Sequence, residues 1–226
     1  KNHGDIRVDN YYWIKEKENP EVIDYLEREN DYYHRMTKSS KSLKEDLFIE
    51  MKKRIKEEDE SVPYFLNGFW YITRYEKGKQ YPIYTRKKDS LTAGEEILFD
   101  CNKLAKGHDY FQLVGVNVSP DNNKVIFGID LESRRKYTLY VKDLQTNEVL
   151  KTNIKNTTGS SAWSSNNNNF FYVKKNEQTL RPEKVFLHDI SKPKNLDTLI
   201  YHEEDETFSL HINVSKSKEY IFLSSH

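Results

Sequence analysis

The first third of the chain has apolar residues at helical spacing. Val22, Leu26, Tyr33 and Met36 recur at intervals that place them on one face of a helix. The triplet Asn19-Pro20-Glu21 precedes most of this face. It combines a capping side chain, a proline suited to the first turn and an acid favoured at the positive end of a helix. This pattern predicts a helix that begins after Asn19.

A second amphipathic helix is predicted soon after the first. Ser42 and Glu45 have the spacing of a capping box, which marks a helix start. Apolar residues then recur every four positions, at Leu43, Leu47, Met51 and Ile55. Two helices cannot bury these stripes on both sides by themselves, so we expect another layer beneath them.

The hydrophobic period changes near Ser61. From there on, short aromatic or β-branched runs alternate with turn residues, which is typical of β-strands. The runs 69–75 and 81–86 are separated by a glycine-containing turn and predict a hairpin. The runs form four groups, near residues 61–100, 110–150, 160–202 and 207–226. The second group ends with a weak strand near Val149, and the third group begins with the strand at Ala162-Trp163.

The last three groups contain a similar polar turn ahead of a hydrophobic run. These turns begin at Ser119, Ser164 and Ser215, so successive turns are 45 and 51 residues apart. That spacing is near the period of a four-stranded propeller blade, and Pro, Asp and Asn supply the turn chemistry. We therefore predict a mainly β protein with a partial β-propeller. An antiparallel sandwich whose turns are similar by chance is the alternative.

The groups correspond to about three and a half four-stranded blades. We expect an N-terminal arm with two helices at residues 1–60 and the partial propeller at residues 61–226, with two outer strands missing from the last blade. A propeller usually closes with about four to eight blades, and an open stack leaves blade faces and edges exposed. We therefore expect this chain to be a fragment of a longer protein.

Composition excludes several classes of function. The 226 residues include 36 basic and 36 acidic side chains, so the formal net charge is zero and no strong field favours nucleic acid or an anionic membrane. Aromatic residues make up 13% of the chain, which argues against disorder. Cys101 is the single cysteine, so neither an internal disulfide nor a cysteine-based zinc site is expected. We expect neither nucleic acid nor a membrane as a partner.

The sequence contains no recognisable catalytic motif. Gly159-Ser160-Ser161 lacks the second glycine of a Gly-x-Ser-x-Gly nucleophile elbow and precedes a predicted strand, so we interpret it as a loop between blades. The seven histidines form no His-x-x-x-His or His-x-His pair, and no glycine-rich phosphate-binding loop is present. We therefore predict that this sequence contains no catalytic, cofactor-binding or metal-binding residue.

One acidic run is a candidate for peptide recognition. The residues Glu203 to Glu206 are all acidic and lie in a predicted connection between the third and fourth blades. If this connection faced a central cavity, it would attract basic peptides. A solvated loop without a recognition role is the alternative.

Several segments, in order along the chain, are similar to segments of a known family. They are residues 3–14, 20–30, 68–84, 107–111, 118–121, 134–139, 179–182 and 204–208. Together they resemble the N-terminal arm and first blades of the prolyl oligopeptidase family of serine peptidases, in particular its oligopeptidase B (protease II) branch. The resemblance covers essentially the whole chain.

This resemblance implies a full-length serine peptidase in which a seven-bladed propeller caps an α/β-hydrolase domain. Such enzymes cleave short peptides after Arg or Lys, and the propeller restricts entry by size. The Ser-His-Asp triad of the family lies beyond the propeller, so no catalytic residue is transferred to this chain, which we expect to be inactive alone. The implied partners are short basic peptides and the protein's own C-terminal α/β-hydrolase domain. Without that domain, an apolar patch is expected at Leu47, Phe48, Met51 and Ile55.

Two points stay open at this stage. A non-enzymatic β-propeller that serves as a protein-interaction module shares the blade repeat, but it has no need of the arm at residues 3–30. The compartment that the resemblance implies is the cytoplasm. The periplasm is the alternative if a signal peptide has been removed.

Overall fold

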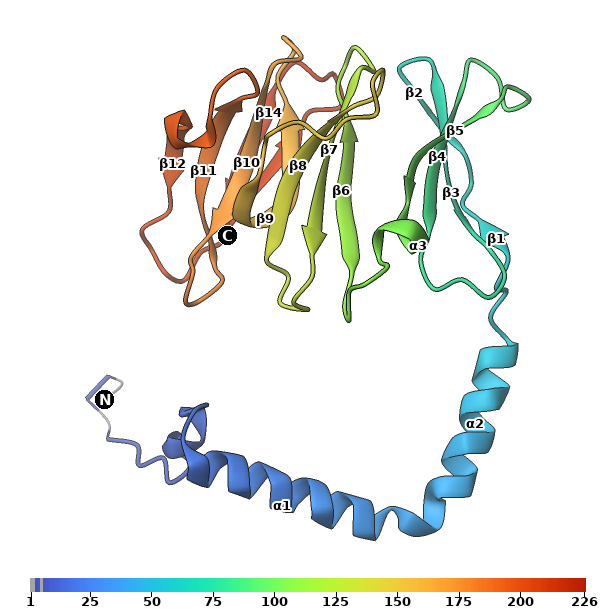
Figure 1. Ribbon diagram of the computed structural model, residues 1–226. Helices are drawn as coiled ribbons and strands as arrows, with labels where there is room; N and C mark the ends of the chain where they lie inside the picture. Colours follow the sequence, from blue (N-terminus) through green and yellow to red (C-terminus); the bar gives the residue numbers. More distant parts are fainter. Residues whose placement is uncertain (1–2, 5) are drawn as a thin grey trace. The chain divides into compact units, whose positions relative to one another are not determined.

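The computed structural model of the protein describes residues 3, 4 and 6–226 (Figure 1). Asp5, part of the N-terminal segment on which the family resemblance rests, lies outside the described residues. The chain divides into two compact units, Lys1–Lys56 and Glu57–His226. The first is helical and the second is built of strands. Within the described residues, no helix has the length and apolar character needed to cross a bilayer.

The predicted start of the first helix is confirmed. A 3-10 helix at Tyr12–Lys15 comes first, and the helix α1 then covers Pro20–Met36. The side-chain oxygen of Asn19 accepts a hydrogen bond of 3.0 Å from the backbone N–H of Glu21. This bond satisfies one of the backbone donors that a helix start leaves without a partner.

The second helix, α2, is present at Lys41–Lys53, but the predicted capping box is wrong. A single 3-10 turn, Lys38–Ser40, joins α1 to α2, so the residue before the helix is Ser40. Its backbone has φ −95° and ψ 8° rather than the extended geometry of a capping residue, and its side chain makes no capping bond. Ser42 lies inside the helix and does not cap it.

The strand unit begins with a blade of five short strands. β3 lies at its centre, with β1 and β2 along one edge and β4 then β5 on the other side, all antiparallel. The bounds are β1 Asp59–Glu60, β2 Tyr64–Leu66, β3 Phe69–Tyr75, β4 Ile83–Lys88 and β5 Glu95–Asp100. The pairing of β3 with β4 confirms the predicted hairpin. A short helix, α3, at Cys101–Leu104 leads on to the next blade.

The second and third blades share one long strand, β9, and form a seven-stranded sheet. Its strands are β6 Gln112–Val118, β7 Lys124–Asp130, β8 Tyr137–Asp143, β9 Ile154–Trp163, β10 Asn169–Lys175, β11 Pro182–Asp189 and β12 Thr198–His202. The first part of β9 pairs with β8, where Thr157 opposes Tyr137, and its last part pairs with β10, where Trp163 opposes Phe170. The weak strand predicted near Val149 is only an isolated bridge to Lys142.

Glycines allow β9 to pass close to the second blade. A Cβ atom added to Gly115 would lie 2.0 Å from the carbonyl oxygen of Gly159, and one added to Gly159 would lie 2.5 Å from the side chain of Val114. Both glycines have positive φ, at +65° and +82°. A residue with a side chain would therefore force the two segments apart.

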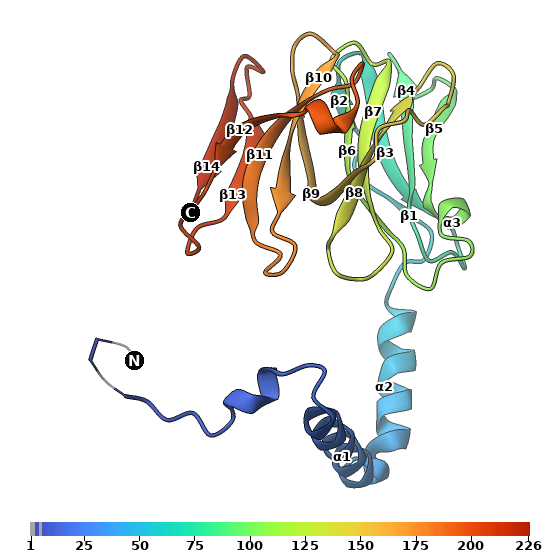
Figure 2. The same cartoon turned by 60° about the vertical axis from the view of Figure 1, so that its left-hand side comes forward.

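The fourth blade is represented by a two-stranded sheet of β13 Leu210–Val214 and β14 Ile221–Ser225, next to the third blade (Figure 2). Three apolar clusters lie between successive blades. Phe99 meets Phe127 between the first two blades, with ring centroids 4.5 Å apart. The residue before Phe127 on β7, Ile126, points the opposite way and packs with Phe170. The predicted partial β-propeller is confirmed: three blades, the first of five strands and the next two of four strands each with β9 in common, and the start of a fourth.

Candidate functional site

The predicted serine turns adopt one repeated conformation. In each turn the serine N–H donates to the carbonyl five residues on, over 2.8–2.9 Å, and its own carbonyl accepts from the N–H three residues on. The residue at that third position has a left-handed backbone: Asn122, Asn167 and Lys218 have φ of 62°, 59° and 62°. Asn67, in the turn between β2 and β3, has φ 49°. Asparagine adopts this conformation more readily than most residues. Lysine adopts it less readily than asparagine.

Side chains of these turns connect different blades at one end of the strand unit. Asn122 Nδ2 donates to the carbonyl of Asn67 over 2.9 Å, and the backbone N–H of Asp121 donates to Asn167 Oδ1 over 3.0 Å. Lys218 Nζ donates to Asn67 Oδ1 over 3.2 Å, which joins the fourth blade to the first. We call Asn67 and the turns 119–123, 164–168 and 215–219 the turn rim.

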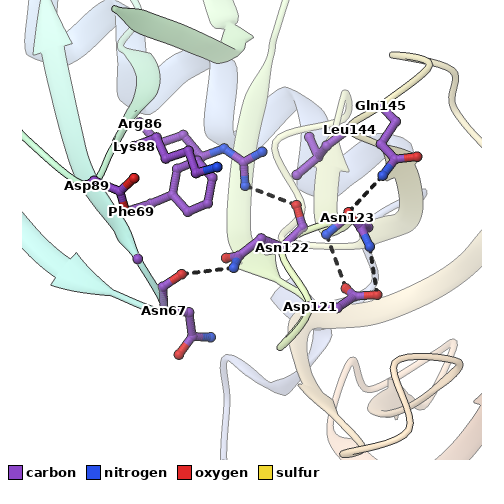
Figure 3. Close-up of a pocket in the computed structure, with 11 residues that line it drawn as sticks. Asn67, Phe69, Arg86, Lys88, Asp89, Asp121, Asn122, Asn123, Leu144 and Gln145 are labelled. Atoms are coloured by element: carbon purple, nitrogen blue, oxygen red, sulfur yellow. Dashed lines mark hydrogen bonds between the residues drawn. The ribbon is translucent and has the colours of Figure 1, made fainter. Parts of the chain in front are cut away.

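A pocket of about 350 Å³ opens beside the turn rim, between the first two blades (Figure 3). Its lining comes from the turn rim, from β4 and from the segment after β8. The lining residues are 67–69, 86, 88–89, 121–123 and 144–145.

Arg86 fixes the wall of this pocket. Its side chain is buried and forms two hydrogen bonds with the carboxylate of Glu96, at 2.7 and 2.9 Å. It also donates to the carbonyl of Asn122 over 3.2 Å, and its guanidinium carbon lies 4.1 Å from the centroid of the Phe69 ring (Figure 3). One buried cation therefore connects β4 to a turn of the next blade.

The other polar groups in the pocket lining differ in their partners: Gln145 Nε2 donates to Asn123 Oδ1 over 3.0 Å, whereas some groups have none. Asn122 Oδ1 is buried and accepts no hydrogen bond. Within the described residues, the ammonium of Lys88 and the carboxylate of Asp89 form no ion pair. Asp121, in contrast, is fully engaged. Burial disfavours its charge, but hydrogen bonds from Ser119 Oγ and from the N–H of Asn123 outweigh this effect and lower the pKa of Asp121.

A buried histidine–aspartate pair lies elsewhere, in the third blade, and sequence reasoning missed it. His188 Nδ1 is 2.6 Å from Asp197 Oδ1, and the hydroxyl of Tyr172 donates to Asp197 Oδ2 over 2.8 Å. Burial first, and then the hydrogen bond to Asp197, raise the pKa of Tyr172. His188 Nε2 is buried and makes no hydrogen bond. The pair therefore cannot reach a substrate, and we interpret it as a clamp that holds the segment before β12 on the blade.

The two serines that were considered as nucleophiles, Ser160 and Ser161, are part of a β-strand. Ser160 and Ser161 lie within β9, not on a turn from a strand into a helix and not in the predicted loop between blades. Ser161 accepts hydrogen bonds from Asn117 Nδ2 at its carbonyl, over 2.9 Å, and at its hydroxyl, over 3.2 Å. The loop prediction failed because the residues before Ala162 are small and polar and give no strand signal.

The acidic run joins β12 to β13, between the third and fourth blades, as predicted. Arg181 shapes this loop, because its guanidinium donates to the carbonyls of Glu203, Asp205 and Phe208 at 2.8–3.1 Å. Glu203 Oε1 accepts the N–H of Asp205 over 3.1 Å. Glu204 and Glu206 remain exposed.

Cys101 is buried and unpaired. Burial first, and then the charge of Asp100, raise the pKa of its thiol to about 12. The thiol is therefore protonated and unreactive at neutral pH. No group of three or more His, Cys, Asp or Glu side chains in the described part of the chain could hold a metal ion.

Comparison with known proteins identifies the family. A sequence profile described as the N-terminal β-propeller domain of prolyl oligopeptidase matches residues 1–226. The chain belongs to this family. It is 36% identical to dipeptidyl aminopeptidase BI of Pseudoxanthomonas mexicana and 35% identical to protease 2 of Moraxella lacunata, over 98% and 99% of its own length. It spans a third of these relatives, 33% in each case.

The solved structures agree with this assignment. The oligopeptidase B of Leishmania major superposes with a TM-score of 0.87 at 28% identity, over 97% of this chain and 32% of that protein. The chain therefore corresponds to the N-terminal part of these relatives. The described residues contain no recognisable catalytic centre, which is consistent with this position.

Proposed function

We propose that the protein to which this chain belongs is an oligopeptidase B-like serine endopeptidase that cleaves short peptides after Arg or Lys. The observation that supports this proposal most strongly is the fit to oligopeptidase B over 97% of the chain. The relative named protease 2, at 35% identity, points to the same branch of the family.

In this proposal the chain restricts access and positions the substrate, and the chemistry takes place elsewhere. The strand unit would form one wall of a chamber that admits short flexible peptides and excludes folded proteins. Confinement beside a Ser-His-Asp triad on a C-terminal α/β-hydrolase domain would favour reaction by proximity and by exclusion of water. We propose the cytoplasm as the compartment.

The helical unit would pack on that same hydrolase domain. Leu43, Leu47, Phe48, Met51 and Ile55 are all exposed. The first four of these side chains lie on α2, whose pattern requires an apolar partner, and Ile55 follows the end of the helix at Lys53.

The exposed Glu204 and Glu206 would add a weak attraction for basic peptides. Charge-neutral replacement of both acids should raise KM at low salt and change little at high salt, because salt screens exposed charges; an unchanged KM at low salt would remove this role.

Cleavage specificity tests the proposal. Purified full-length protein should hydrolyse N-acetylated chromogenic peptides that present Arg or Lys at the cleavage site. Peptides that present Pro or Ala there should react far more slowly, and a folded protein rich in Arg should remain intact. Cleavage of the folded protein at a comparable rate would contradict the restriction by size.

A second candidate function follows from the name of one relative. At 36% identity, the relative from P. mexicana is called a dipeptidyl aminopeptidase, which implies release of dipeptides from a free N-terminus. Acetylation of the substrate separates the two functions, because it blocks only the second. A protein that cleaves no peptide at all would favour the interaction module.

A further inference from the structure

A second pocket between the first two blades, of about 330 Å³, lies at the end of the strand unit opposite the turn rim. Its lining comes from the start of β4, the first residue of α3 and the segment that leads into β6. The lining residues are Tyr81, Pro82, Tyr84, Cys101 and 110–113. None of these side chains is charged at neutral pH, in contrast to those beside the turn rim. The pocket therefore suits an uncharged group.

Aromatic side chains form one wall of this pocket, and their positions are fixed. The rings of Tyr81 and Phe111 meet edge to face, with centroids 5.6 Å apart. Asn102 holds the backbone of Tyr81, because its Oδ1 accepts the Tyr81 N–H over 2.9 Å and its Nδ2 donates to the Tyr81 carbonyl over 2.8 Å. Such a wall offers ring edges and faces on which another aromatic ring can pack.

Two hydrogen-bond donors of the same lining are accessible and have no partner within the described residues. Gln112 Oε1 accepts from the hydroxyls of Tyr110 and Tyr137, over 3.1 and 2.8 Å. These two bonds orient the side-chain amide and leave its Nε2 group to donate elsewhere. The hydroxyl of Tyr84 is the second donor. Neither Gln112 Nε2 nor this hydroxyl is among the buried polar atoms that lack a partner, so a ligand in the pocket can reach both.

We propose that this pocket binds an uncharged aromatic residue of a short peptide. The aromatic side chain packs against the rings of Tyr81 and Phe111, and the backbone carbonyl of the same residue accepts from Gln112 Nε2. The Tyr84 hydroxyl donates to the preceding peptide carbonyl. That the ligand is a peptide rests on the proposed function. Because that function requires Arg or Lys at the cleaved bond, the aromatic residue lies elsewhere in the substrate.

The size and neutrality of the pocket limit what it can hold. A volume of about 330 Å³ is at the small end of the range for ligand sites, which suits one residue with its peptide groups and not a folded partner. A Lys or Asp side chain would lose hydration without meeting an opposite charge in the lining. An aliphatic side chain would fill the space without the favourable contact between rings. We therefore expect aromatic residues to bind best and charged residues worst.

Fluorine NMR of a probe bound to the full-length protein tests the inference. The protein is first treated with a fluorophosphonate, so that a serine active site is blocked. The probe is the amide of N-acetyl-para-fluorophenylalanine, which is uncharged and whose fluorine signal should broaden on binding. Acetyl-Phe-amide should displace the probe, and acetyl-Leu-amide should do so only at several-fold higher concentration. Acetyl-Lys-amide and acetyl-Asp-amide should not displace it.

Gln112→Glu separates contact with the ligand from a purely structural role. The carboxylate still accepts from the hydroxyls of Tyr110 and Tyr137 but cannot donate to a peptide carbonyl, so binding of the probe should weaken at least about tenfold. Tyr84→Phe removes the second donor and should weaken binding several-fold. Tyr140→Phe is the matched control, because Tyr140 packs against the same apolar cluster without lining the pocket. It should bind the probe as the wild type does.

Three results would overturn the proposal: wild-type affinity in Gln112→Glu or Tyr84→Phe, equal displacement by the charged and the aromatic amides, or no binding of the probe. If Gln112→Glu does not fold, Tyr84→Phe decides the outcome. Because binding is measured without turnover, a protein that does not react with the fluorophosphonate but binds the probe would contradict the proposed peptidase and leave the pocket assignment standing.

Discussion

The helical unit and the strand unit of this chain treat the same residue types differently. Leu47 of α2 is 46% exposed, whereas Leu139 of β8 is fully buried. Among the described residues of the helical unit only Val22 is buried, while each pair of neighbouring blades encloses an apolar cluster. The strand unit thus provides its own core, whereas the helical unit leaves most of its apolar side chains exposed.

This difference follows from the geometry of the two elements. Successive side chains of a strand point to opposite faces, so each blade can pack on two neighbours and the clusters repeat along the chain. A pair of helices has stripes of apolar residues that need another layer. Exposed apolar side chains in the helical unit are therefore evidence for a docking surface.

The largest loss of folding stability is expected from substitution of the closely packed glycines of the strand unit. Gly115→Val should cost about 4 kcal/mol or more, because the new Cβ atom would lie 2.0 Å from the Gly159 carbonyl and φ is +65°. Gly94→Ala is the control: no atom lies within 4 Å of its added Cβ, and we expect a change within about 0.5 kcal/mol. Denaturant unfolding measures both. Equal midpoints for the two variants would contradict the close approach of β9 to the second blade.

Two leucines test the comparison between the units directly. Leu139→Ala should destabilise the 226-residue chain by about 3 kcal/mol, because it leaves a cavity between blades. Leu47→Ala should cost less than about 0.5 kcal/mol in the same chain. In the longer protein the cost of Leu47→Ala should rise above about 1 kcal/mol, because a docked partner would cover the side chain. A cost that stays negligible there would mean that α2 docks on no partner.

A smaller, pH-dependent effect is expected at Glu183. Hydrogen bonds from Lys184 at 2.9 Å and Asn176 at 3.1 Å, with the nearby charge of Arg181, lower the pKa of this carboxyl despite burial. Because the folded pKa is depressed, the stabilisation is present above the unfolded pKa and is lost as pH falls through the folded value. Glu183→Gln should cost about 1.5 kcal/mol at pH 7 and progressively less below about pH 4. A cost that is independent of pH would refute the charged role.

The smallest change in stability is expected from substitutions near the starts of the two helices, α1 and α2. Asn19→Ala should weaken α1 by about 1 kcal/mol, since the capping bond to Glu21 is lost. Ser42→Ala should have no destabilising effect, because Ser42 lies inside α2 and alanine is the better helix former. Hydrogen exchange of the first turn of each helix measures both changes. The reverse order would restore the capping box.

Local patterns predicted most of the strands and the three serine turns of the turn rim, because alternation and turn chemistry act over a few residues. Long-range features were not predictable in this way. Arg86 contacts Asn122, 36 residues away, and His188 finds Asp197 only through the packing of the third blade. The first part of β9 was missed because its polar residues pair with β8 and β10 through the backbone. The pocket depends on these distant contacts, and no motif marks it.

The most direct test of the account is the intact mass of the native protein from its source cells, measured together with fluorophosphonate labelling. We predict one labelled species far heavier than 27.0 kDa, with residues 1–226 forming its N-terminal region. An unlabelled native protein near 27.0 kDa would contradict the peptidase assignment. The propeller would then be an interaction module in its own right.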